Sequence, residues 1–339
     1  MIRPWTMVRK GALVDLALQV RAALVYDVPG DFVECGVWRG GAAFLMADCL
    51  RRAGVRNRKV WLFDSFQGLP DPREIDGPAA REHADNPDSP WYFDNCAASL
   101  EEVRRAAHQL GLEDYVELVE GWFDDTLPAY RSRLGEIAIL RIDCDWHASV
   151  KCCLDNLYDN VSPNGFVVFD DYFTFDGAAV AVHEFLGERR LAHRLENVIS
   201  KEDGYESYHC ALFRNGSPTW NETRGWLARI DRAVADIETH VPAGASAILV
   251  DAGELLAAGG TTTAVRPFLE RDGEFWGAPS DSTTAIEELE RMRREGARHA
   301  VFAWPAFWWL EHYADFARHL RATYAVKAET HDVLIFDLQ

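Results

Sequence analysis

Two short apolar runs that end in carboxylates constrain the fold of this chain more than any other feature. Ile137–Asp145 reads IAILRIDCD, and Phe166–Asp171 reads FVVFDD. Each run has the length of a fully buried strand and is too short for a helix. Ligands of an open α/β sheet bind outside the carboxyl ends of its strands, so we expect acids at two such ends to converge on one site. Four Asp side chains are delivered in this way: Asp143, Asp145, Asp170 and Asp171.

This group of carboxylates predicts a site for a hard divalent cation. Carboxylates that lie close together repel one another unless a cation lies among them. Oxygen ligands without a Cys or His pattern of zinc spacing favour Mg²⁺ or a similar ion over zinc. The alternative is that each Asp only caps a helix or forms a turn. Any one of these Asp residues could have only such a structural role, but we do not expect this of all four together.

The composition predicts a soluble protein of two domains. A chain of 339 residues is too long for one average domain, and its 48% hydrophobic content is enough for real cores. The net charge of -19 argues against nucleic acid or an anionic membrane as a partner, because phosphate binding requires clustered Lys and Arg.

Targeting signals and disulfides are not expected either. No stretch reaches the roughly 18 apolar residues of a membrane span, and the N-terminus MIRPWTMVRK lacks the apolar core of a signal peptide. The seven Cys residues form no CxxC pair, which favours reduced thiols and a cytoplasmic location.

Strands and helices alternate along the first part of the chain, which predicts a doubly wound α/β sheet. The further strands are expected at Asp31–Cys35, Val60–Phe63, Tyr115–Val119 and Tyr208–Phe213. The helices are expected at Val8–Tyr26, Gly41–Ala53, Leu100–Leu110, Ala148–Asn160 and Val180–Phe185. The segment Pro70–Pro90 is rich in Pro, Asp and Gly without periodicity, so we expect a mobile cover over the active site, with structural padding as the alternative.

The turns after the first three strands predict a nucleoside site. The glycine-rich turn Glu34–Gly41 lets the backbone approach a ligand closely. Asp64 and Ser65 follow the second strand, where an acidic side chain commonly binds the two hydroxyls of a ribose. The turn lacks a GxxxxGK[ST] pattern and Glu34 would repel a pyrophosphate, so a nucleoside without phosphates fits, and S-adenosylmethionine is the common one. Gly121–Phe123 follow the third strand, and the aromatic pair is placed to close around an adenine, although such pairs are more often core.

Five segments of the chain resemble the macrocin O-methyltransferase family, whose members methylate sugar hydroxyls of macrolide and aminocoumarin antibiotics. The segments are GDFVECGVWRGG at Gly30–Gly41, WLFDSFQGLP at Trp61–Pro70, GWFDDTLP at Gly121–Pro128, LRIDCDWHAS at Leu140–Ser149 and FDDY at Phe169–Tyr172. Their order and number make the resemblance far more specific than a glycine-rich turn alone. It covers about the first 215 residues.

The resemblance implies a Rossmann-like class I methyltransferase that uses S-adenosylmethionine and Mg²⁺ and often forms homodimers. It implies that Asp143, Asp170 and Asp171 hold the metal while Asp145 acts as general base. His147 is a competing base, although a His at this place could equally hold the start of the next helix. The candidate cofactor contacts are Glu34, Gly36, Asp64, Ser65 and Trp122 from the motifs, with Met7 and Arg39, and also Gly121 and Phe123 from the third turn.

A change of composition near residue 215 predicts a methyltransferase domain over 1–215 and an accessory domain over 216–339. Arg214–Thr223 has the Asn, Gly, Ser and Pro content of a linker. Strands at Ile248–Asp251, Ala300–Ala303 and Val333–Asp337, with helices at Asp281–Glu295 and Trp309–Tyr324, predict a smaller α/β unit of unknown role. Trp308 and Trp309 could stack on a sugar, but paired Trp residues more often anchor a core or an interface.

The sequence therefore predicts a Mg²⁺-dependent O-methyltransferase that acts on a sugar or other vicinal diol of a bacterial natural product. A sugar hydroxyl is a poor nucleophile, so methyl transfer to it requires a proton acceptor and stabilisation of the developing alkoxide. A catechol-like phenol is the alternative acceptor, since it also presents paired oxygens to Mg²⁺. A nucleoside-binding scaffold, in which the second domain carries the biology, is the alternative from another class, although the presence of all four Asp residues argues against an inactive enzyme.

Overall fold

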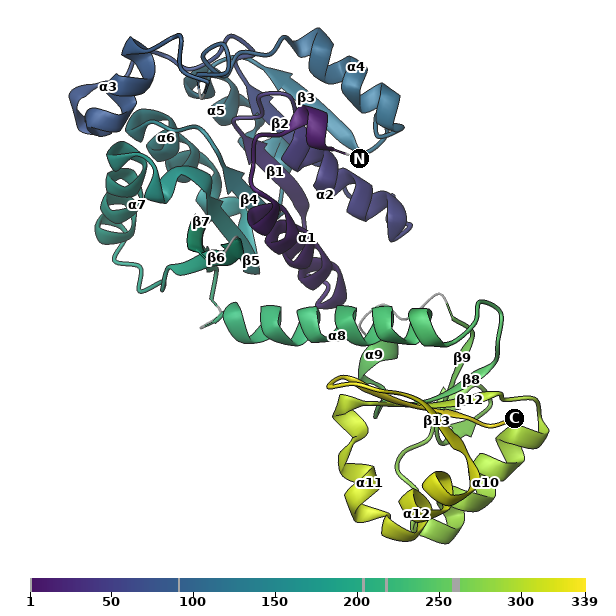
Figure 1. Ribbon diagram of the computed structural model, residues 1–339. Coiled ribbons are helices and arrows are strands. Elements are labelled where there is room, and N and C mark those ends of the chain that lie inside the picture. The colour runs from purple at the N-terminus through teal and green to yellow at the C-terminus, as the bar shows by residue number, and fades with distance from the viewer. Residues whose placement is uncertain (1, 91, 203–204, 217–218, 258–262) are drawn as a thin grey trace. The chain divides into compact units, whose positions relative to one another are not determined.

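The computed structural model describes residues 2–90, 92–202, 205–216, 219–257 and 263–339. The chain forms two units, Met1–Arg224 and Gly225–Gln339 (Figure 1). Each unit has its own sheet. The division lies inside the helix α8 (Asn221–His240), beyond the boundary expected near residue 215.

The buried apolar runs of the first unit form the centre of a seven-stranded sheet of order β3-β2-β1-β4-β5-β7-β6. Its strands are β1 (Asp31–Cys35), β2 (Val60–Asp64), β3 (Val116–Glu120), β4 (Ile137–Ile142), β5 (Val161–Phe169), β6 (Glu196–Glu202) and β7 (Tyr205–Arg214). The first five strands are parallel, while β7 pairs antiparallel with β5 and β6 antiparallel with β7. All six residues of β4 are buried, which agrees with the continuous apolar run in its sequence. The predicted doubly wound sheet is confirmed.

Helices cover both faces of this sheet. They are α1 (Lys10–Val25), α2 (Gly41–Arg52), α3 (Gly77–Asp85), α4 (Leu100–Leu110), α5 (Phe123–Leu134), α6 (His147–Leu157) and α7 (Asp176–Glu188), with 3₁₀ turns η1 (Arg3–Trp5), η2 (Glu74–Asp76), η3 (Tyr158–Asn160) and η4 (Asp170–Phe173). Figure 1 shows α1, α2 and α4 on one side of the sheet and α5, α6 and α7 on the other. The α4 capping box is present as its sequence indicates, because Ser99 Oγ accepts from the Glu102 N–H at 3.3 Å.

Several elements of the first unit differ from the sequence-based expectation. The segment Pro70–Pro90, expected to lack periodic structure, contains η2 and α3. Its buried Asp76 accepts from the Arg73 N–H at 2.6 Å and from the His147 N–H at 2.7 Å. The second contact, to a residue distant in the chain, stabilises this segment. The strand β6 was not expected, and β5 begins at Val161, before the Pro163–Gly165 turn signal.

The end of the first unit contradicts part of the predicted linker. Residues 217–218 lie outside the described residues, but Trp220 is buried and its ring centroid lies 4.9 Å from that of Phe166. Its Nε1 donates to Asp15 at 3.2 Å, and Arg224 donates to the same carboxylate at 3.2 Å. The predicted linker therefore does not extend to Trp220, because this residue belongs to the core of the first unit.

The second unit is a smaller α/β unit whose sheet has the order β13-β14-β12-β8-β9. Its strands are β8 (Ala247–Val250), β9 (Val265–Pro267), β12 (His299–Ala303), β13 (Ala325–Glu329) and β14 (Val333–Asp337), beside a hairpin of β10 (Glu270–Arg271) and β11 (Glu274–Phe275). Its helices, beyond most of α8, are α9 (Glu254–Ala257), α10 (Ser282–Arg294), α11 (Trp308–His312) and α12 (Ala314–Thr323), with the turn η5 (Trp304–Ala306).

In this unit the long helix expected at Trp309–Tyr324 is divided. Tyr313 leaves helical geometry with ψ 64° and separates α11 from α12, and β13, which was not expected, follows. Trp309 is fully buried in the core while Trp308 is 47% exposed.

Two findings bear on the composition-based expectations. All seven cysteines are free thiols. Among the described residues, no helix combines the length and the apolar character that crossing a bilayer requires.

Replacing Trp220 by Ala is expected to lower the free energy of unfolding of the first unit by about 3–5 kcal/mol, because a buried indole is lost and a cavity remains. Tyr26→Ala is the control in the same unit, since Tyr26 is 49% exposed, and it should change stability by no more than about 0.5 kcal/mol. Urea unfolding followed by circular dichroism measures both. Equal stability of the two variants would place Trp220 outside the core.

Candidate functional site

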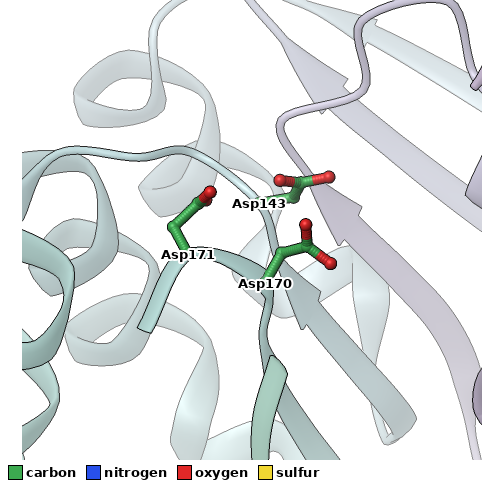
Figure 2. Close-up of side chains that lie close together, drawn as sticks. All are labelled: Asp143, Asp170 and Asp171. Carbon is green, nitrogen blue, oxygen red and sulfur yellow. The ribbon is translucent and has the colours of Figure 1, made fainter. Parts of the chain in front are cut away.

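The predicted metal ligands converge at the carboxyl ends of two neighbouring strands. Asp143 follows β4, and Asp170 and Asp171 open the turn η4 directly after β5. Each contributes a carboxylate oxygen, and these oxygens lie within 4.8 Å of one another. Figure 2 shows the three side chains rising from their strand ends toward one region. Parallel pairing of β4 with β5 brings them together, because it places Ile142 beside Phe169.

A buried arginine that sequence reasoning missed holds these acids. Arg141 on β4 is 2% exposed, and its Nη1 donates to Glu34 Oε1 at 2.6 Å and to Asp143 Oδ2 at 2.5 Å. Its Nη2 donates to Asp170 Oδ1. Glu34 lies directly beside Arg141 in the β1–β4 register. The signal in the sequence was a single cation inside an apolar run, two residues before Asp143 and therefore on the same face of the strand.

Glu34 links this cluster to the glycine-rich turn. Burial raises the pKa of the Glu34 carboxyl to about 8, against the opposing effect of the Arg141 charge. One of its oxygens, Oε1, binds Arg141, whereas Oε2 is buried without a hydrogen-bond partner in the structure. Because an unpaired buried acceptor is costly, this oxygen marks a place for a donor group of a ligand.

The turn after β1 requires glycine. At Gly36, φ is +85° and a Cβ would lie 1.7 Å from the Asp143 carbonyl oxygen, so no side chain fits there. Asp64 at the end of β2 holds the turn from the other side. Its Oδ2 accepts from the N–H groups of Val37 at 2.6 Å and Trp38 at 3.3 Å. Asp64 thus has a structural role that the ribose-binding interpretation did not include.

These strand ends and turns line one cavity that opens to solvent. The predicted residues that line it are Met7, Glu34, Gly36, Asp64, Ser65, Trp122, Phe123, Asp143, Asp145, Asp170 and Asp171. Sequence reasoning did not place Trp5, Thr6 and Val8 or Gly68 and Leu69 in its wall. The N-terminal segment is there because it packs closely on α2: a Cβ on Gly41 would lie 2.5 Å from the Trp5 carbonyl oxygen.

Three predicted residues are not brought to the cavity. The Arg39 guanidinium lies over the Trp38 ring, 4.7 Å from its centroid, and borders a separate hollow beside α4. Gly121 has φ +140° and donates its N–H to the Asp64 carbonyl at 2.9 Å, which is a role in the turn. His147 is the first residue of α6, and its Nε2 lies 2.7 Å from a Glu184 carboxylate oxygen.

Asp145 lines the cavity in an unusual backbone conformation. Its φ of +59° falls in the left-handed region, which Asp tolerates better than most residues. Its N–H donates to Asp171 Oδ2 at 3.2 Å. Burial raises the pKa of the Asp145 carboxyl well above its usual range, and the charges of Asp143 and Asp170 raise it further. A carboxylate in this environment is a stronger proton acceptor than one in water.

The three ligand carboxylates fit a hard divalent cation. Burial raises the pKa of Asp170 to about 7, with the Asp143 charge adding to it and Arg141 opposing it. Burial and the neighbouring charges of Asp145 and Asp143 raise the pKa of Asp171 as well. The excess negative charge, the convergent oxygens and the lack of any nitrogen or sulfur in the donor set suit Mg²⁺.

Comparisons with known proteins identify a family that this chain resembles. A family model described as macrocin-O-methyltransferase (TylF) matches residues 3–205. The chain is 39% identical over 202 residues to the 8-demethyl-8-(2,3-dimethoxy-alpha-L-rhamnosyl)-tetracenomycin-C 4'-O-methyltransferase of Streptomyces olivaceus, which covers 59% of this chain and 72% of that protein. It is 40% identical over 195 residues to the demethyldecarbamoylnovobiocin O-methyltransferase of Streptomyces niveus, which covers 56% of this chain and 71% of that protein.

A solved structure extends the similarity to the fold. The structure of the O-methyltransferase NovP superposes with a TM-score of 0.54 at 35% sequence identity and covers 63% of this chain and 83% of that one. The family model leaves residues 206–339 unmatched.

Replacing Arg141 by Met is expected to lower the free energy of unfolding by about 3–5 kcal/mol, because Glu34, Asp143 and Asp170 lose the cation that compensates them. The loss should be larger at pH 8 than at pH 6. The pKa values of Glu34 and Asp170 are raised to about 8 and about 7, so at the lower pH protonation removes much of the unpaired charge.

The control for this prediction is Arg104→Met, because Arg104 is exposed and its ion pair is with the exposed Glu101. Thermal and urea unfolding at the two pH values compare the variants. A pH-independent loss in Arg141→Met would mean that packing, and not charge compensation, is the contribution of this residue.

Proposed function

The chain belongs to the macrocin-O-methyltransferase (TylF) family and is an S-adenosylmethionine-dependent O-methyltransferase, and we propose that it methylates a sugar hydroxyl of a glycosylated bacterial natural product in a Mg²⁺-dependent reaction. The observation that carries the proposal is the meeting of Asp143, Asp170 and Asp171 beside Asp145 in one cavity. A metal triad next to a proton acceptor is what O-methylation of a weakly acidic hydroxyl requires.

The names of the relatives support a sugar as acceptor. The Streptomyces olivaceus enzyme is named for a position on a rhamnosyl tetracenomycin, and the Streptomyces niveus enzyme for a novobiocin derivative. Both are O-methyltransferases, and both align with this chain over more than two thirds of their own length. The proposed acceptor class is therefore a glycoside.

The residues at the ends of β1, β2 and β3 fit the methyl donor. The unpaired Oε2 of the buried Glu34 suits the ammonium group of its methionine part. Close approach is possible because Gly36 has no side chain. Asp64 faces the same cavity, and Trp122, which is 43% exposed, offers an indole face for the adenine.

The metal triad and Asp145 have different roles at the acceptor hydroxyl. When bound, S-adenosylmethionine supplies an electrophilic methyl group on a sulfonium, and Mg²⁺ supplies Lewis acidity toward adjacent hydroxyls. Methyl transfer from sulfur to oxygen releases the hydroxyl proton. Asp145 is the group that takes it, because its carboxylate lines the cavity next to the triad and its pKa is raised. Arg141 keeps Asp143 and Asp170 in place, because its guanidinium donates to Oδ2 of Asp143 and to Oδ1 of Asp170. The other oxygen of each carboxylate is then available to a cation.

The second unit has an accessory role in this proposal. Every residue that lines the cavity belongs to the first unit. We further propose a cytoplasmic homodimer, supported by the seven free thiols for the location and by the family resemblance for the assembly.

Magnesium affinity is expected to fall as the pH drops below about 7, because protons then compete for Asp170, whose pKa is raised to about 7. The fall should approach about tenfold per pH unit for each proton displaced. Calorimetric titration with MgCl₂ at pH 8 and pH 6 measures it. Asp170→Asn should abolish binding at both pH values, whereas Asp125→Asn, at an exposed position of α5, should not change it. Equal affinity of the wild type at the two pH values would remove Asp170 from the metal site.

Asp145→Asn is expected to lower turnover by about 10² to 10⁴ while metal and donor affinities survive, because the amide keeps the shape but not the basicity. His147→Gln is the matched control, since its ring binds Glu184 and does not line the cavity. The turnover of His147→Gln should fall by less than about tenfold. The readout is the gain of one methyl group by a panel of glycosides, including 4-methylumbelliferyl α-L-rhamnopyranoside, followed by mass spectrometry.

The pH profile of turnover separates the two candidate bases. In the wild type, activity should fall on the acid side as Asp145 becomes protonated, and this limb should disappear in Asp145→Asn. An acid limb that persists unchanged in Asp145→Asn and is lost in His147→Gln would transfer the role to His147. Methylation of no glycoside in the panel would contradict the proposed acceptor class.

A further inference from the structure

An exposed apolar patch adjoins the turn that carries the metal ligands. It consists of Phe173, Tyr208 and Ile199, which are 42%, 51% and 36% exposed, and we call it the aromatic platform. The ring centroids of Phe173 and Tyr208 lie 5.2 Å apart. Ile199 is the direct partner of Tyr208 in the β6–β7 ladder. Three large apolar side chains therefore share one surface of the first unit.

The fold places this platform at the edge of the sheet where the acids lie. Phe173 ends η4, whose first residues are Asp170 and Asp171. The strand β7 runs antiparallel to β5, and Ala211 is the partner of Phe169, the last residue of β5. Residues of β7 that precede Ala211 therefore extend past the carboxyl end of β5, and Tyr208 lies beside η4 for this reason.

Neighbouring side chains hold the platform in place. The Tyr172 ring lies 5.0 Å from that of Phe173. The Tyr172 hydroxyl lies 2.8 Å from His183 Nε2 on α7, and the two rings stack at 5.8 Å. Rings that are already fixed lose little conformational entropy when a ligand binds on them.

The order of the strands separates this surface from the donor residues. Most of those expected to contact S-adenosylmethionine lie at the carboxyl ends of β1, β2 and β3, and the proposed metal ligands follow β4 and β5. The platform belongs to η4, β7 and β6, beyond β5 in the sheet order. In this strand order the platform lies on the side of the acids that is opposite to the donor residues.

We propose that the aromatic platform binds the apolar ring system, or aglycone, to which the methylated sugar is attached. This inference rests on the proposed function, since it requires a glycoside acceptor. Flat unsaturated rings suit the two adjacent aromatic side chains, which prefer offset or edge-to-face contacts at 4.5–7 Å. The platform sets specificity by contributing affinity outside the reacting centre, so its removal raises KM with little change in kcat.

The test compares two acceptors that differ only in the aglycone: 4-methylumbelliferyl α-L-rhamnopyranoside and methyl α-L-rhamnopyranoside. In the wild type, KM for the first should be lower by about three- to tenfold, the range of an aromatic contact. In the double variant Phe173→Ala with Tyr208→Ala, the ratio of the two KM values should fall to near one. Tyr208→Phe, which retains the ring, should keep most of the preference.

Controls separate this effect from folding and assembly. Tyr26→Ala removes an aromatic side chain of 49% exposure elsewhere in the same unit and should leave the ratio unchanged. Sedimentation of each variant reports the oligomeric state. If the double variant changes a dimer into a monomer, the platform is an interface between copies of this chain and the inference is overturned. It is overturned equally if the wild type shows no preference or if the double variant keeps it.

A direct binding measurement distinguishes failure of this inference from failure of the proposed function. Fluorescence quenching of free 4-methylumbelliferone requires no methyl transfer. Suppose that neither rhamnoside is methylated while the wild type, but not the double variant, quenches the fluorescence of the free aglycone. This result would support aglycone binding by the platform and contradict the proposed acceptor sugar. Equal quenching by both proteins overturns the platform whatever the activity.

Discussion

A single guanidinium, that of Arg141, lies buried among the acids at the ends of three adjacent strands. It bonds Glu34 in β1, Asp143 after β4 and Asp170 after β5. Without a cation at this position, the carboxylates that the chemistry requires would repel one another in a region of low dielectric. The arginine therefore lets these strand ends approach closely, and it brings together Asp143 and Asp170, two of the proposed metal ligands.

Backbone contacts extend this arrangement toward the donor. The turn after β1 crosses so close to Asp143 that Gly36 has no room for a side chain, and the Asp64 carboxylate fixes the same turn through its N–H groups. The residues proposed for the donor and those proposed for the metal are thus parts of one packed structure. Glu34, with one oxygen on Arg141 and the other unpaired, lies where the two meet.

The order of the strands separates the residues proposed for the donor, the metal and the aglycone. The residues proposed for the donor follow β1 to β3, the acids follow β4 and β5, and the exposed Phe173 and Tyr208 lie beyond them. The antiparallel β7 is essential here, because a parallel strand would not carry Tyr208 past the end of β5. The direction of the late strands, which no local pattern in the sequence specified, therefore shapes the surface next to Asp170 and Asp171.

The sequence by itself determined the parallel sheet and the position of the acids, because continuous apolar runs report buried strands and the residues after them must lie at their carboxyl ends. Only the tertiary structure decided which candidates meet. The His147 ring lies against Glu184, 37 residues away in the chain, whereas the Arg39 guanidinium lies over the ring of its neighbour Trp38. No local pattern in the sequence specified either side-chain direction. The ordered α3, the start of α8 and the burial of Trp220 have the same cause: their segments carry weak local signals, and contacts such as those of Asp76 and Asp15 stabilise them.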